Sequence, residues 1–183
     1  ICGSGHRGAG RGLAFGEIAD LSGLAALRSL RRLSLDQLLP DGDLTGVLPT
    51  GAPLEHLHLG TIALMRAHAL RGLRAWPTLI SLSLGDPREF TGPDWREVAA
   101  LPALTSLVLR RLTLEHSLRT MPELPGVRDL RLTSRRDAHL LRALAERLPN
   151  VRRVVFRSRW GYADQRELHA QLFPAAEITY LRS

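Results

Sequence analysis

Three groups of residues have the types and spacing that binding or catalytic chemistry requires. Residues 3–8, GSGHRG, match the G-x-G-x-x-G pattern of phosphate-binding loops. Cys2 is the only cysteine and therefore the only thiol nucleophile that the chain offers. His56 and His58 have the spacing of two metal ligands on one strand. These residues raise three hypotheses to test, which are nucleotide binding, thiol catalysis and metal binding.

The residues around the glycine pattern do not fit a nucleotide-binding loop. Such a loop follows a buried strand and opens a helix, but only Ile1 and Cys2 precede Gly3. The acidic residue expected about 20 residues later, to bind a ribose, is absent from residues 22–24. A Walker or kinase loop also needs lysine, and the 25 basic residues are all arginine. We therefore expect residues 1–12 to form a flexible linker that binds no cofactor.

Cys2 and the two histidines lack the partners that their chemistry needs. Cys2 lies in a glycine-rich terminus with nothing to orient it for nucleophilic attack. His56 and His58 would share a strand face whose neighbours are arginine and serine, so a third metal ligand is missing. We expect no metal site and no catalysis by this chain.

Composition is typical of one soluble globular domain. The chain has 183 residues, of which 44% are hydrophobic, and no apolar run reaches the roughly 20 residues of a membrane span. A single cysteine excludes an internal disulfide, so a reducing cytoplasm is the expected location. The first residue is Ile rather than Met, and we expect the chain to continue an upstream polypeptide. No membrane partner and no small-molecule substrate are expected.

The net positive charge comes entirely from the second part of the chain. The formal net charge is +7. Residues 1–100 hold 10 arginines and 10 acidic residues, whereas residues 101–183 hold 15 arginines and 8 acidic residues. The C-terminal part therefore carries the whole excess, which predicts an acidic partner for that part.

A pattern of apolar residues recurs every 23 to 25 residues. Each copy reads apolar-x-x-apolar-x-apolar, and residues two apart point to the same face of a strand. One such strand cannot bury its apolar side alone, so the copies are expected to stack into a parallel sheet, with Leu82 and Leu107 fully buried. The six clear copies begin at Leu30, Leu54, Leu79, Leu104, Val127 and Val151, and a degenerate seventh begins at Ala175.

The segments between the copies must return the chain to the start of the next strand. Capping boxes that begin at Asp94 and Asp164, with Asp in place of Ser or Thr, predict two helices. Asp137 predicts the N-cap of a third. We expect a loop or short turns over residues 39–53, and a helix or an imperfect capping repeat over residues 13–29. The third helix would bury one face, formed by Leu140, Leu141, Leu144 and Leu148.

Over residues 21–183 this array resembles the leucine-rich-repeat family. The resemblance implies an α/β solenoid, a short horseshoe with a parallel β-sheet on the concave face and helices and turns on the convex face. Residues 1–20 would be a glycine-rich linker or an N-terminal cap. The family's Asn or Cys two residues past each strand is absent, so backbone bonds or apolar packing are expected to close these turns. The equivalent positions are Leu38, Ile62, Pro87, Leu112, Arg135 and Arg159.

Alternation along the predicted strands gives the residues of the concave face. This face changes from small and neutral in the early copies to basic in the later ones. Asp129 would share a column with Arg153 and neutralise part of its charge. Arginine and aromatic residues are enriched in binding hot spots, so a protein with an acidic surface is the predicted partner. The predicted partner-binding residues are His56, His58, Ser83, Arg110, Arg111, Arg131, Arg153, Arg157, Arg159 and Trp160.

The array also resembles the C-terminal sensor regions of bacterial NACHT and related STAND-type NTPases. That resemblance implies a non-catalytic sensor or autoinhibitory module, covalently linked to an upstream NTPase domain. Two other functions stay open at this point. A basic solenoid could bind nucleic acid through its arginine-rich half, or the domain could serve as an intramolecular scaffold.

Overall fold

The described residues form one eight-stranded, all-parallel sheet in which the strands follow one another in sequence order. The computed structural model describes residues 12–15, 22–35, 44–46, 48–60, 69–85, 90–110, 118–133, 137–158 and 165–182. Each of the seven predicted copies contains one strand, and an additional strand precedes them. The strands are β1 Gly12–Phe15, β2 Arg32–Leu35, β3 His56–Leu59, β4 Ser81–Leu84, β5 Ser106–Arg110, β6 Asp129–Thr133, β7 Arg153–Ser158 and β8 Glu177–Arg182.

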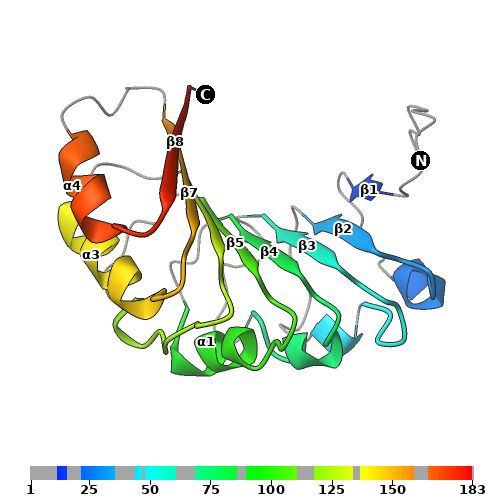
Figure 1. The fold of residues 1–183 in the computed structure, drawn as a ribbon. Helices are drawn as coiled ribbons and strands as arrows, with labels where there is room; N and C mark the ends of the chain where they lie inside the picture. Colours follow the sequence, from blue (N-terminus) through cyan, green and yellow to red (C-terminus); the bar gives the residue numbers. More distant parts are fainter. Residues whose placement is uncertain are drawn as a thin grey trace.

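Helices cover one face of this sheet. Figure 1 shows the strands side by side along the inner side of a curve, with the helices along its outer side. We call the helix-free face the concave face. The α-helices are α1 Gly92–Ala99, α3 Ala138–Arg147 and α4 Arg166–Leu172, and the 3₁₀-helices are η1 Ser22–Ala26, η2 Leu44–Gly46 and η4 Leu73–Ala75.

The core lies between the sheet and the helices. Leu82 and Leu107 are paired in register on neighbouring strands, and both are fully buried, which confirms the sequence prediction. The same row continues without a shift in both directions along the sheet. The core also holds two fully buried tryptophans, of which Trp76 donates from Nε1 to the carbonyl of Pro49 at 2.9 Å. The row consists of Leu33, Leu57, Leu82, Leu107, Leu130 and Val154.

A repeated backbone contact joins each copy to the next. The carbonyl of Arg31 accepts from the N–H groups of Glu55 and His56, at 2.8 and 2.9 Å. The equivalent carbonyl in four later copies accepts the same pair of bonds. Because only main-chain atoms take part, this contact does not require the Asn of the family pattern. The four later acceptors belong to Glu55, Ile80, Thr105 and Arg128.

Two of the three predicted caps fall on described residues, and one of them is shifted. The Asp137 side chain caps α3 by accepting from the N–H groups of His139 and Leu140, as predicted. Asp94, predicted to be an N-cap, is instead the third residue of α1, and Thr91 is the N-cap. The helix begins earlier because Pro93 fits the first turn, where no N–H is needed. The third candidate, Asp164, lies outside the described residues.

The buried Asp94 carboxylate links two neighbouring copies. Its Oδ2 accepts from the N–H and the hydroxyl of Thr91, at 3.0 and 2.9 Å. Its Oδ1 accepts from the N–H of Leu70, at 3.3 Å, in the preceding copy. Three donors satisfy a carboxylate that is only 1% exposed, so burying this charge is compatible with a stable core.

The N-terminal part contains strand as well as 3₁₀-helix. β1 lies within residues 1–20, for which a linker or an N-terminal cap is expected, and it pairs in parallel with β2. Residues 13–29 therefore contain most of β1 and the single turn η1 in the described part. Residues 39–53 contain the short helix η2, consistent with the expected turns. Residues 1–11, with the glycine pattern and Cys2, lie outside the described residues.

Candidate partner-binding face

The concave face consists of columns of side chains that run across the strands. The strands alternate buried and less buried residues, so every second side chain points away from the helices. The first residues of the strands form one column, and the third residues form the next. The longer strands β5–β8 also have a fifth residue, and these residues form a third column. The third-position column contains Ser34, His58, Ser83, Val108, Arg131, Val155 and Thr179.

Apart from Arg32 at the start of β2, the N-terminal part of this face presents serine and histidine, and we call it the neutral part. His58 and Ser83 lie on neighbouring strands, and His58 Nδ1 is 2.9 Å from Ser83 Oγ. His56 is paired in register with Ser81. Both histidines are half-buried, and among the described residues no group of three His, Cys, Asp or Glu side chains could hold a metal ion. This part offers hydroxyl and imidazole groups, and the exposed Arg32 lies at its edge, at the first position of β2.

The C-terminal part presents three exposed arginines from three successive strands. Arg110 ends β5, Arg131 is the third residue of β6, and Arg157 is the fifth residue of β7. Arg110 is paired with Thr133, and Arg157 continues the same register beyond the pair Leu132 and Phe156. Thr133 therefore lies between two of the arginines in the fifth-position column, with Arg131 two residues before it on the same strand.

No opposite charge in the described part of the chain neutralises these three arginines. None of Arg110, Arg131 and Arg157 makes an ion pair or a side-chain hydrogen bond within the described residues. Other arginines do have carboxylate partners. These pairs are Arg31 with Glu55, Arg74 with Glu97 at 3.6 Å, and Arg153 with Asp129 at 3.6 Å.

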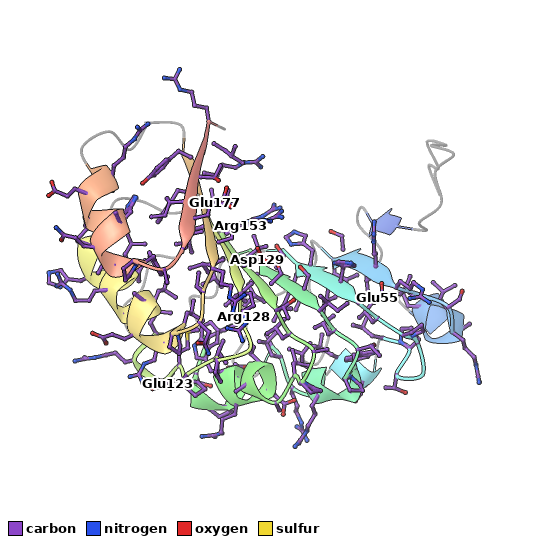
Figure 2. The ribbon with its side chains drawn as sticks, viewed as in Figure 1. Glu55, Glu123, Arg128, Asp129, Arg153 and Glu177 are labelled. Carbon is purple, nitrogen blue, oxygen red and sulfur yellow. The ribbon has the colours of Figure 1, made fainter. Side chains whose placement is uncertain are left out.

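Two acidic residues lie in the first-position column, next to the three arginines. The Arg153–Asp129 pair confirms the expectation that Asp129 neutralises part of Arg153. Glu177 is paired in register with Arg153 on the other side. Figure 2 shows Asp129, Arg153 and Glu177 in succession across β6, β7 and β8, whereas Glu55 lies far away on the N-terminal part of the sheet. Arg153 thus contributes less free positive charge than its position suggests.

Apolar side chains flank the central arginine. Val108 and Val155 are the register neighbours of Arg131 on β5 and β7, and both are half-buried on the concave face. The arrangement therefore combines uncompensated positive charge with apolar surface, the composition typical of a protein-binding hot spot.

Alternation along the strands predicts Thr133 on this face, although Thr133 is not among the predicted binding residues. Glu177, which also lies on the concave face, was missed by the sequence prediction. Of the predicted residues, Arg111, Arg159 and Trp160 lie outside the described residues. The six positions at which the family's Asn or Cys is absent lie outside them as well.

An aromatic cluster closes the C-terminal end of the sheet. The ring of the buried His169 stacks on Phe156, with 3.9 Å between the ring centroids. His169 Nδ1 is 3.2 Å from the hydroxyl of Tyr180. The guanidinium of Arg166 lies 5.2 Å from the centre of the Tyr180 ring. Burial raises the pKa of the Tyr180 phenol, and the charge of Arg166 opposes this rise. This cluster packs α4 onto the last two strands, away from the three arginines.

No family model, no curated protein and no solved structure matches this chain. In the part of the chain that the structure describes, no helix is both long enough and apolar enough to cross a membrane.

Proposed function

We propose that the chain is a leucine-rich-repeat module that recognises an acidic surface of a protein partner through its concave face. It would form a short horseshoe of six clear repeats and a degenerate seventh at the C-terminus. The 23–25-residue spacing, the unbroken register of the sheet and the recurring contact between copies support this assignment. Solenoids of this kind bind partners along the inner surface of the curve.

The observation that carries the proposal is the set of three exposed arginines that have no carboxylate partner among the described residues. Arginines that only keep a surface soluble can pair with nearby acids, as Arg31 and Arg74 do. Arg110, Arg131 and Arg157 instead leave three positive charges on one side of the sheet, beside two valines. An acidic partner would supply the missing charges, and its apolar groups would cover Val108 and Val155.

The distribution of positive charge on the concave face favours a protein partner over a nucleic acid. A nucleic-acid strand carries a regular series of phosphates and needs a basic track to follow. Here the charge is compact in the described residues. Across the strands it gives way to Ser83 and His58, and toward the start of the strands it meets Asp129 and Glu177. The two carboxylates would repel a polyanion that extended beyond the three arginines.

The larger context that the sequence suggests belongs to the same proposal. As the C-terminal sensor or autoinhibitory region of a bacterial NACHT or STAND-type NTPase in the cytoplasm, the module would bind a trigger protein or hold the upstream domain inactive. This part of the proposal is an analogy between folds and depends on no residue of the concave face.

A selection from a random peptide display library tests the proposed function. The library is panned against the wild-type chain, and the selected peptides are then measured against R131E/R157E and against R119E/R142E. The control variant makes the same change in net charge at two exposed arginines outside the sheet. We expect peptides rich in Asp, Glu and apolar residues that bind wild type and control but not R131E/R157E.

Two outcomes would contradict the proposal. If R131E/R157E folds and binds the peptides as wild type does, the arginines are not the site and the neutral part around His56, His58 and Ser83 becomes the candidate. If duplex DNA binds more tightly than any peptide, and log K falls by about 0.9 per phosphate contact for each tenfold rise in salt, the module is a nucleic-acid binder.

A further inference from the structure

We propose that Arg110, Arg131 and Arg157 together bind one phosphoryl group, carried by a phosphorylated side chain of the protein partner, above Thr133. This inference rests on the proposed function and deepens it, because it names the chemical group that the acidic partner presents. The site is built from three adjacent strands of the concave face, and four side chains compose it.

The register of the sheet arranges the three arginines around Thr133. Strands lie about 4.8 Å apart and residues about 3.3 Å apart along a strand. The Cα atoms of Arg110 and Arg157 are then about 10 Å apart, with Thr133 midway between them, and each is about 8 Å from Arg131. Three long guanidinium side chains that start from this triangle can meet above the hydroxyl of Thr133, which adds a fourth donor.

The charge and the number of donors match a phosphate better than a carboxylate. A carboxylate carries one negative charge on two oxygens, and one arginine satisfies both oxygens through a bidentate contact. Two arginines would then remain uncompensated beside it. A phosphorylated side chain carries about −1.5 to −2 charges at pH 7 and has three strong acceptor oxygens. It can therefore engage all three arginines and also accept from the Thr133 hydroxyl.

The surroundings limit the site to one such group. Arg153 is already paired with Asp129, and Glu177 follows it in the same column, so a second phosphate would meet negative charge there. On the other side, the third-position column continues through Val108 to Ser83, without charge. The half-buried Val108 and Val155 favour a phosphate that comes with apolar neighbours, as in a peptide, over free inorganic phosphate.

Three matched peptide pools test this site. Each pool has one fixed central residue, which is phosphoserine, Glu or Ala, and degenerate positions on both sides. Binding is measured by fluorescence polarisation with wild type, R131Q, R157Q and T133V, and with R142Q as the control on α3. We expect the phosphoserine pool to bind at least about tenfold more tightly than the Glu pool, since charge-assisted contacts to a dianion exceed those to a monoanion.

The variants separate the site from general electrostatics. R131Q and R157Q should each remove the preference of wild type for phosphoserine over Glu, whereas R142Q should keep it. T133V should reduce the affinity for phosphoserine severalfold and leave the affinity for Glu unchanged. Thermal unfolding of each variant shows whether it is folded. Inorganic phosphate alone, in the same buffer, should compete only weakly, because it lacks the apolar neighbours.

The outcomes distinguish failure of this site from failure of the proposed function. If the Glu pool binds as tightly as the phosphoserine pool and loses affinity in R131Q, the phosphoryl site is wrong and the acidic-partner function survives. If neither acidic pool exceeds the Ala pool, both are wrong. If inorganic phosphate binds as tightly as the phosphoserine peptides and displaces them, the site binds phosphate, but a phosphorylated protein partner is the wrong source of it.

Discussion

The two parts of the concave face share one backbone arrangement and present different chemistry. β2–β4 present mainly serine and histidine, with Arg32 at the edge, whereas β5–β7 present four arginines and two valines together with Ser106, Asp129 and Thr133. Yet the buried row of leucines crosses the boundary without a shift, from Leu82 to Leu107. The side chains that hold the sheet together are therefore separate from those that form the concave face. In this fold the concave face can change while the contacts that stabilise the sheet stay the same.

Negative charge added to the two parts should have very different effects on binding. In R131E/R157E, binding of an acidic peptide should fall by at least about 100-fold, because hot-spot residues contribute about 2 kcal/mol or more each. S34E/S81E also introduces two glutamates, but on the neutral part. Salt screens these charges from the arginines, so binding should change little. Fluorescence polarisation measures both affinities. Equal losses in the two variants would show that the whole face binds.

The cores beneath the two parts should respond alike to truncation. Leu82→Ala and Leu107→Ala each empty a fully buried position, at an expected cost of about 2–5 kcal/mol in the free energy of unfolding. Urea denaturation followed by circular dichroism measures each cost. If the two unfolding costs differed by nearly the full width of this expected range, the two parts would differ in the core as well as on the surface.

The contact between His58 and Ser83 should matter for stability and not for binding. Ser83→Ala removes a 2.9 Å contact that is half-buried, and the expected loss is about 0.5–1.5 kcal/mol of stability. Affinity for the acidic peptides should stay as in wild type, because the arginines lie on other strands. A variant with unchanged stability and weakened binding would place the neutral part inside the interface.

Removal of the Asp129 carboxylate should strengthen binding slightly. Exposed ion pairs contribute about 0.2–1 kcal/mol, so Asp129→Asn frees Arg153 from a contact of that size. The released charge should then tighten binding of acidic peptides by no more than about fivefold. Isothermal titration calorimetry of wild type and variant resolves a change of this size. Weaker binding in the variant would mean that Asp129 itself contacts the partner.

The strands and the core were predictable because they depend on local pattern. Leucines at alternate positions, repeated at nearly constant spacing, determine both the strand faces and the order of the sheet. The start of α1 was predicted wrongly at Asp94, although Thr91-Gly92-Pro93-Asp94 contains a Thr three residues before an acid and a Pro suited to the first turn.

The site was harder to predict because it depends on where each strand ends. The repeating pattern stops at Leu109, Leu132 and Phe156, but the strands continue beyond these residues. That continuation aligns Thr133 with Arg110, and it is a property of the assembled sheet rather than of any one copy. The charge of Arg153 was easier to judge, since its pairing with Asp129 follows directly from the spacing of two neighbouring copies.

The shared carbonyl that joins each copy to the next has a consequence for how such a chain can change in length. Its donors and acceptor are all main-chain atoms, so the joint is the same whichever side chains a copy carries. Duplication or excision of one whole copy would leave every remaining joint intact and would change the width of the inner surface by one strand, about 4.8 Å. An insertion of one residue within a strand would instead turn its leucines toward the solvent. Gene duplication in units of one copy is thus the route by which this architecture can enlarge its surface.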